Sequence, residues 1–289
     1  TYGVGEVLRD AVVKGATKIV ICCGGSCSND GGIGVGAALG FRFQDENGNE
    51  VEPVGGNLHR IRIFREPIDP DKRELLNLIR RLKIVAAVDT DATFVGNHGA
   101  TFTFAKQKGA RPEDLPVLEE GMCNILSLWR SSDLFPDNHL YNSKGAGAAG
   151  GLSAGLIAFC HARIESGFDM ICGHVHLREA ISEADLVLTG EGAADATSGK
   201  VPYEIAKLCH QFGVHCAVIT GQIPDRRQLD ILLEGGASAG VFSIVPGPID
   251  VDHAIEHAKE LLEQSTENVI RAFMAGYNKN SQLRPQLSD

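Results

Sequence analysis

Short apolar runs rich in β-branched residues alternate with stretches of helical periodicity along much of this chain. Five continuous apolar runs predict strands over 18–23, 84–89, 185–190, 215–221 and 239–245. Because these runs are apolar throughout, they predict a parallel sheet that is covered on both faces. Helical spacing predicts helices over 3–14, 33–39, 72–82, 115–130, 148–165, 175–183, 202–212 and 251–273. The alternation of the two patterns indicates an α/β fold.

The length of 289 residues is enough for two domains, because single hydrophobic cores stop growing at about 250–300 residues. We place the first domain at 1–170 and the second at 171–289. Residues 41–70 contain turn signals, an Asn-Gly pair and alternating apolar positions, so they predict a small β excursion inside the first domain.

Composition and charge argue against several classes of protein. The chain has 27 basic and 37 acidic side chains, so its net charge is −10, which disfavours a general electrostatic attraction to nucleic acid or to an anionic membrane. No apolar run approaches the ~20 residues of a membrane-spanning helix. The eight cysteines are too few for a disulfide-rich framework in a chain of this size. We expect a cytoplasmic protein with small-molecule partners and leave a homodimer open.

The segment GGSCSNDGG at 24–32 follows the first predicted strand directly. Open α/β sheets bind ligands at the carboxyl ends of their strands, and glycines let the backbone approach a ligand closely. Gly24 and Gly25 would bring backbone groups, Ser26 and Asn29 polar side chains, and Asp30 a carboxylate. A strand-to-helix turn without a ligand is the alternative. The G-x-G-x-x-G spacing of a dinucleotide site is missing from this segment.

Two carboxylates stand at the end of the second predicted strand. Asp89 and Asp91 lie two residues apart, which suits a magnesium site or a catalytic base, and Lys106 and Lys108 follow on a loop. The alternative is a solvated strand end without a ligand.

Small residues dominate the segment GAGAAGGLSAG at 145–155. At the start of a helix they allow a neighbouring backbone or helix to come close, so packing is the favoured interpretation of this segment.

The segment TGEGAADATSGK at 189–200 follows the predicted strand at 185–190. Glu191 and Asp195 offer carboxylates, Thr189 a hydroxyl, and Lys200 a partner for phosphate. It is not a Walker A loop. Six residues lie between Gly192 and Gly199 where that motif has four, and Val201 follows the lysine where the motif has Ser or Thr.

Other motifs give weaker evidence for a functional site. Cys172, His174 and His176 could suggest a metal site, but no second pair completes a zinc set with usable spacing, so ordinary helix or surface histidines are favoured. The chain has no G-x-S-x-G elbow for a serine hydrolase.

In this order, the segments resemble the bacterial glycerate kinase family that forms 2-phosphoglycerate. TYGVGE at 1–6 is similar to the motif that enters the family's central part, and GGSCSNDGG to its GGS-x-x-NDGG motif. Residues 89–110 resemble its D-x-D segment leading to Gln-Lys-Gly-Ala, and GAGAAGG and TGEG-x-x-D…GK follow. The resemblance runs from Thr1 to about residue 275. It implies two α/β domains, one of them a Rossmann-like parallel sheet with helices on both faces.

The resemblance also implies a reaction, the transfer of the γ-phosphoryl group of ATP, as its Mg²⁺ complex, to a hydroxyl of glycerate, with 2-phosphoglycerate the favoured product. We hypothesise that Asp195 acts as the base or orients the hydroxyl, that Asp89 and Asp91 hold Mg²⁺ or share that task, and that Lys200 meets phosphate or the glycerate carboxylate. The hypothesised catalytic residues are thus Asp195, Asp89 and Lys200. The hypothesised substrate and phosphate ligands are Gly24, Gly25, Ser26, Asn29, Asp30, Lys108, Thr189 and Glu191.

The chain departs from the family pattern in three places. Val88-Asp89-Thr90-Asp91-Ala92-Thr93-Phe94 replaces the usual Cys-Asp-x-Asp-Asn-Pro-Leu, and the stretch after Asp195 is shorter than usual and lacks Gln-Thr. The family's first segment, with its Pro-Asp-Ser-Phe-Lys and Asp-Gly-Gly-Glu-Gly-Thr motifs, is absent, and the helical pattern is already under way by Val4. We therefore expect this chain to lack the N-terminal segment that would complete the second domain.

Two other functions stay open at this point. One is an NAD(P)-dependent oxidoreductase of a small hydroxy acid on a doubly wound sheet. The other is a non-catalytic regulator that binds a sugar acid on the same fold, for which the altered segments at 92–94 and 196–198 leave room.

Overall fold

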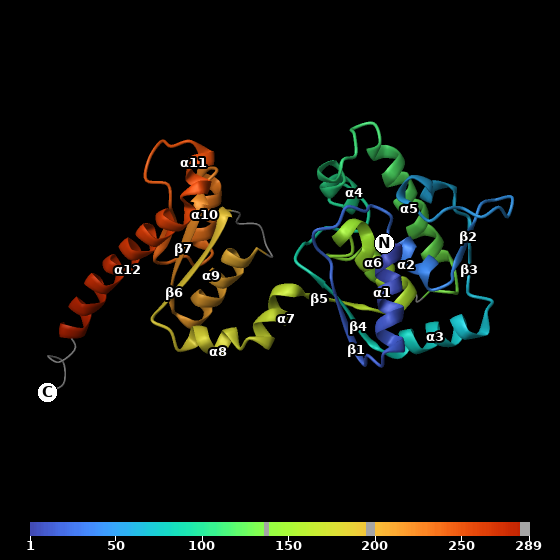
Figure 1. The fold of residues 1–289 in the computed structure, drawn as a ribbon, viewed down its shortest axis with the longest axis horizontal. Coiled ribbons are helices and arrows are strands. Elements are labelled where there is room, and N and C mark those ends of the chain that lie inside the picture. Colours follow the sequence, from blue (N-terminus) through green and yellow to red (C-terminus); the bar gives the residue numbers. More distant parts are fainter. Residues whose placement is uncertain (136–138, 195–199, 284–289) are drawn as a thin grey trace. The chain divides into compact units, whose positions relative to one another are not determined.

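The computed structural model describes residues 1–135, 139–194 and 200–283, with side chains placed up to residue 276. The chain forms two compact units, Thr1–Met170 and Ile171–Asp289. Each unit contains a three-stranded parallel sheet with helices packed against it (Figure 1). The α/β fold class predicted from the alternating pattern is confirmed.

The sheet of the first unit has the strand order β1-β4-β5, with β1 at Lys18–Cys22, β4 at Lys83–Val88 and β5 at Arg163–Ser166. Ile19 lies opposite Ile84, and Val85 opposite Arg163, in parallel register. The central strand is buried from Ile84 to Val88. An antiparallel pair, β2 (Arg42–Gln44) and β3 (Ile63–Arg65), confirms the β excursion expected between residues 41 and 70.

Helices and aromatic rings build the core of the first unit. Its α-helices are α1 (Tyr2–Val13), α2 (Ile33–Ala38), α3 (Pro70–Arg81), α4 (Ala100–Phe104), α5 (Leu115–Ser131) and α6 (Ala148–Cys160), and its 3₁₀ turns are η1 (Gly55–Arg60), η2 (Lys106–Lys108) and η3 (His139–Asn142). Helix α7 (Gly167–His174) begins in the first unit and ends in the second. The fully buried ring of Phe159 lies 5.0 Å from the ring of Phe41, 5.6 Å from that of Phe135 and 6.0 Å from that of Trp129, between centroids. These contacts fasten α6 and α5 to the chain around β2.

The start of α6 is not helical. Ala149, Gly150 and Gly151 have φ values of 52°, 69° and 87°, in the left-handed region that favours glycine. A Cβ on Gly150 would lie 2.0 Å from the carbonyl oxygen of Ser28, and one on Gly155 would lie 2.6 Å from that of Gly31. The small residues of this segment therefore serve close packing, against the backbone of the loop at 24–32.

The second unit repeats the plan on a smaller scale. Its sheet has the order β6-β7-β8, with β6 at Leu186–Ala193, β7 at His215–Gln222 and β8 at Gly240–Ser243. Its helices are α8 (Leu177–Ser182), α9 (Val201–Phe212), α10 (Arg226–Glu234), α11 (Val251–Glu256) and α12 (Ala258–Leu283). Both α9 and α12 contact the central strand β7, where Cys216, Ala217 and Val218 are fully buried.

Side-chain caps begin several helices where the sequence places an aspartate. Asp69 accepts hydrogen bonds from the N–H groups of Asp71 and Lys72 at the start of α3, and Pro70 occupies the first turn. Asp225 and Asp250 cap α10 and α11 in the same way. These bonds satisfy backbone donors that have no partner inside the helix.

The structure corrects the sequence analysis at several elements. Strand β5 begins within the range predicted as helix 148–165, because His161 adopts a left-handed φ of 55° that ends α6. The helix expected over 175–183 is confirmed as α8. The helix expected over 251–273 is broken at His257, and α4, α7 and α10 were not predicted. Strands β1 and β6 were expected to be buried along their whole length, but they are only partly buried. Both lie at the edge of their sheet among the described residues, and several of their side chains are exposed in alternation.

None of the helices among the described residues combines the length and the apolar surface that crossing a bilayer requires.

The contact of α6 with the loop leads to a prediction about Gly155. In Gly155→Ala the new methyl group has no room against Gly31 and Gly32, so we expect a loss of about 1–3 kcal/mol in the free energy of unfolding. Denaturant titration followed by the fluorescence of Trp129, the single tryptophan and a buried residue of this unit, measures it. Gly3→Ala in α1 is the matched control, because a Cβ there meets nothing within 4 Å. Equal stability of the two variants would contradict the packing argument.

Candidate functional site

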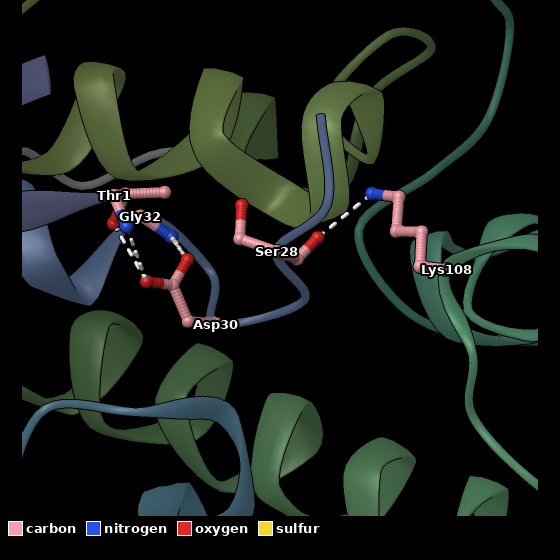
Figure 2. Close-up of polar contacts among 5 residues, drawn as sticks. All are labelled: Thr1, Ser28, Asp30, Gly32 and Lys108. Carbon is pink, nitrogen blue, oxygen red and sulfur yellow. Dashed lines mark hydrogen bonds and ion pairs between the residues drawn. The ribbon is translucent and has the colours of Figure 1, made fainter. Parts of the chain in front are cut away.

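The loop at 24–32 connects the carboxyl end of β1 to α2, and Asp30 shapes its second half (Figure 2). Asp30 is only 5% exposed. Its Oδ1 accepts the backbone N–H of Gly32 at 3.0 Å, and its Oδ2 accepts the Thr1 hydroxyl at 2.7 Å and the Thr1 backbone nitrogen at 3.2 Å. The carboxylate therefore points into the protein, where it holds the turn into α2.

Asn29 is held in place from two sides. Its Nδ2 donates to the hydroxyl of Thr101, on α4, at 3.3 Å, while its Oδ1 is buried and has no hydrogen-bond partner within the described part of the chain. The backbone of Gly55 approaches so closely that a Cβ there would lie 2.3 Å from the Asn29 carbonyl oxygen. An unpaired buried amide oxygen costs free energy, which a ligand donor could recover.

The first half of the loop offers its backbone to solvent. Gly24, Gly25 and Cys27 are exposed, and Gly25 has a φ of 61°. Within the described residues, the backbone N–H groups of residues 24–29 make no hydrogen bond. Several successive N–H groups in a turn of this kind form a concave surface that binds anions.

Lys108 places a positive charge beside this loop, although 80 residues separate it from Ser28 in the chain. Its Nζ donates to the Ser26 hydroxyl at 2.9 Å and to the Ser28 carbonyl oxygen at 2.7 Å, and Figure 2 shows it pointing at Ser28. Burial lowers the pKa of the Lys108 ammonium, and the neighbouring Cys27 and Asp30 act in the opposite direction. The ammonium group closes the loop and adds the charge that an anion would meet.

Asp89 and Asp91 have separate surroundings at the end of β4. The Oδ1 of Asp89 accepts the backbone N–H of Phe168 at 3.0 Å, while the hydroxyl of Ser166 accepts that of Asp169 at 3.1 Å. Together the two side chains satisfy two donors in the first turn of α7. Asp91 forms an exposed ion pair with Lys144, at 2.8 Å between Oδ2 and Nζ.

In the second unit, Thr189 and Glu191 lie in β6, opposite Val218 and Thr220 of β7. Lys200 directly precedes α9. Asp195, the hypothesised base, lies outside the described residues.

A cavity of about 1190 Å³ opens at the carboxyl ends of β6, β7 and β8. Thr189 and Glu191 line it, as do Thr220 and Ser243, and most of the remaining wall is apolar. Val251 and Ile255 of α11 also line the cavity and are exposed. A largely apolar cavity with a few polar groups at strand ends is typical of a binding site for a cofactor or nucleotide.

The structure thus brings some of the predicted residues together and adds others. Ser26 and Lys108 meet, whereas Asp30 turns inward and Asp91 pairs with Lys144. Sequence analysis missed Thr101, the partner of Asn29, and the part of the cavity wall at 243–266. Pro246-Gly247, directly after the last predicted strand at 239–245, is a turn signal at a strand end and could have pointed to that wall.

Comparisons with known proteins agree on one family. The model of the glycerate kinase family matches residues 1–274. A glycerate kinase of Halalkalibacterium halodurans is 34% identical over 97% of this chain and 71% of its own length. A glycerate 2-kinase of Escherichia coli is 32% identical over 95% and 69%. A crystal structure described as a glycerate kinase 2 from Salmonella typhimurium LT2 is 31% identical, covers 96% of this chain and 70% of its own, and has a TM-score of 0.70.

The hydrogen bond between Asp89 and Phe168 leads to a prediction about stability. Asp89→Ala leaves the Phe168 N–H without its acceptor, so we expect a loss of about 0.5–2 kcal/mol in the free energy of unfolding. Asp89→Asn keeps an acceptor oxygen in the same position and should retain most of that stability. Denaturant titration of both variants measures the difference. An Asn variant as unstable as the Ala variant would mean that the charge, rather than the hydrogen bond, stabilises the structure here.

Proposed function

The chain belongs to the glycerate kinase family, and we propose that it transfers the γ-phosphoryl group of ATP to the 2-hydroxyl of glycerate, with 2-phosphoglycerate and ADP as products. The kinase prediction is confirmed at the level of the family. The choice of the 2-hydroxyl is supported by the similarity to the Escherichia coli glycerate 2-kinase. The oxidoreductase alternative loses its support, because the relatives named above are kinases by name.

The observation that carries the proposal is the pairing of an open backbone loop with a lysine. Phosphoryl transfer depends mainly on positioning and on stabilising the charge of the transferred group. The N–H groups of residues 24–29 and the Nζ of Lys108 are donors already in place, since Lys108 is hydrogen-bonded to the loop before any ligand arrives. Donors that need no reorganisation contribute most to the stabilisation of developing charge.

We assign Mg²⁺, which the transfer of a phosphoryl group from ATP requires, to the end of β4. Mg²⁺ prefers carboxylate oxygens and substrate phosphates, and Asp89 fits because its hydrogen bond to Phe168 uses only Oδ1. Asp91 can bind the ion as well only if its ion pair with Lys144 breaks. Both side chains are exposed, so breaking this pair costs little free energy. When bound, the ion would neutralise phosphate charge at this strand end.

We assign the nucleotide to the second unit, where Thr189 and Glu191 line the cavity at the strand ends. Its apolar walls suit the adenine ring, and Lys200 at the start of α9 suits a phosphate. Asp195 keeps its hypothesised role as the base. A loss of about 10²-fold or more in turnover is expected for Asp195→Asn if it acts on the glycerate hydroxyl, and near-normal turnover would remove it from that role.

Release of ADP in the presence of D-glycerate tests the activity, and ³¹P NMR of the product distinguishes 2- from 3-phosphoglycerate. In this assay Lys108→Met should lower kcat by about 10²–10³-fold, because a preorganised charged donor is lost. Ser26→Ala keeps the ammonium and removes one of its two partners, so it should lose less than about tenfold. Absence of ADP release from the folded protein would contradict the kinase activity, and equal effects of the two variants would contradict the role of Lys108.

The nucleotide assignment predicts that narrowing the cavity weakens the binding of ATP alone. Ala254 faces the cavity from α11, so Ala254→Phe should raise KM for ATP by about tenfold or more and leave KM for glycerate unchanged. Asp252→Phe, which puts the same ring on an exposed part of α11 outside the cavity lining, is the control. A KM for ATP that is unchanged in Ala254→Phe would place the nucleotide elsewhere.

A further inference from the structure

We propose that His253, Glu256 and His257 form a binding site for a divalent transition-metal ion of the zinc class. His253 and Glu256 lie in α11 and His257 directly follows it, and none of the three belongs to the site described above. Each offers one ligand atom, and the three atoms lie within 4.8 Å of one another. The spacing explains the geometry, because residues three and four apart share a face of a helix.

The hydrogen bonding of His257 orients the site. The Nδ1 of His257 lies 3.0 Å from the backbone carbonyl oxygen of His253. A carbonyl oxygen can only accept, so Nδ1 carries a proton and donates it, and the lone pair of the neutral ring belongs to Nε2. Metal-ligating histidines commonly donate their second ring nitrogen to a carbonyl in this way, which fixes the tautomer. The two imidazole rings already lie side by side, with centroids 4.1 Å apart.

The chemistry of the three ligands selects the metal. Two imidazole nitrogens and one carboxylate oxygen suit Zn²⁺, Co²⁺, Ni²⁺ or Cu²⁺, whereas Mg²⁺ prefers oxygen ligands alone. Zinc ligands lie at about 2.0–2.2 Å from the ion, so the three atoms need only a small movement of exposed side chains to reach it. The nearby carboxylate of Asp250 is occupied, because it accepts the N–H of Asp252 at 2.9 Å.

The proposed metal site shares helix α11 with the wall of the cavity in the second unit. Val251, Ala254 and Ile255 line the cavity, and His253 and Glu256 occupy other positions of the same short helix. His257 separates α11 from α12. An ion held by residues on both sides of the end of α11 would hold that helix in its present conformation, and with it one wall of the cavity.

Titration of the purified protein with Zn²⁺ in competition with a chromophoric chelator tests the proposal without relying on activity. We expect one equivalent to bind, and His253→Ala and His257→Ala each to lower the affinity at least about tenfold. Glu256→Gln should lower it less, since a weak oxygen ligand remains. His174→Ala is the control, because Cys172, His174 and His176 are the other candidate ligands in the sequence.

Thermal or chemical unfolding of the same variants shows whether a substitution removes a metal ligand or only destabilises the fold. Zn²⁺ at about 100 µM should raise the unfolding midpoint of the wild type and of His174→Ala but not that of His257→Ala. Excess Mg²⁺ should not displace the bound ion. Failure of the wild type to bind Zn²⁺ at this concentration, or wild-type affinity in both His253→Ala and His257→Ala, would overturn the proposal. Loss of binding in His174→Ala alone would move the site to the other cluster and overturn it as well.

Discussion

The close approach of two glycine-rich backbones is the contact on which the first unit depends. The N–H of Gly31 donates to the carbonyl oxygen of Gly150 at 3.0 Å, and a Cβ on Gly150, Gly151 or Gly155 would lie less than 3.0 Å from atoms of the loop. Only glycine tolerates both this distance and the positive φ of Gly150 and Gly151. The contact joins segments more than a hundred residues apart, so the conformation of the 24–32 loop is set by α6 as much as by its own residues.

The consequence for chemistry is that the loop is rigid on one side and open on the other. Asp30 and Asn29 are directed into the protein, and Lys108 ties Ser26 to Ser28. The backbone N–H groups of residues 24–29 make no hydrogen bond within the described part of the chain. An anion that binds there meets donors whose positions were fixed during folding, which is the arrangement that favours phosphoryl transfer.

In the second unit, helix α11 carries both residues that line the cavity and residues of the proposed metal site. One side of α11 lines the cavity with Val251, Ala254 and Ile255, while His253 and Glu256 lie among the exposed positions. The helix is anchored by its Asp250 cap and by its junction with α12, and its apolar side chains toward the cavity remain exposed. A wall with so little buried surface is one that ligands can stabilise, because its own packing contributes little.

Strands β1, β4, β6, β7 and β8 and their parallel arrangement could be predicted from the amino-acid pattern, since a continuous apolar run between turn signals has few other solutions. The sequence also predicted the family, because the motifs around Gly24, Asp89 and Gly145 occur in one order. The candidate residues of the loop could be named for the same reason, as they follow a strand directly.

The contacts of those residues could not be predicted in the same way and follow from the folded structure. It directed Asp30 inward, gave Asp89 the N–H of Phe168 and brought Lys108 to Ser26, because each of these contacts joins segments that no local pattern connects. It ended α6 before Arg163 and broke the last predicted helix at His257, where backbone conformation prevailed over helical periodicity. The pairing of His253 with His257 was present in the sequence as a four-residue spacing. It became a candidate site only when the helix end placed both rings and the Glu256 carboxylate on one side.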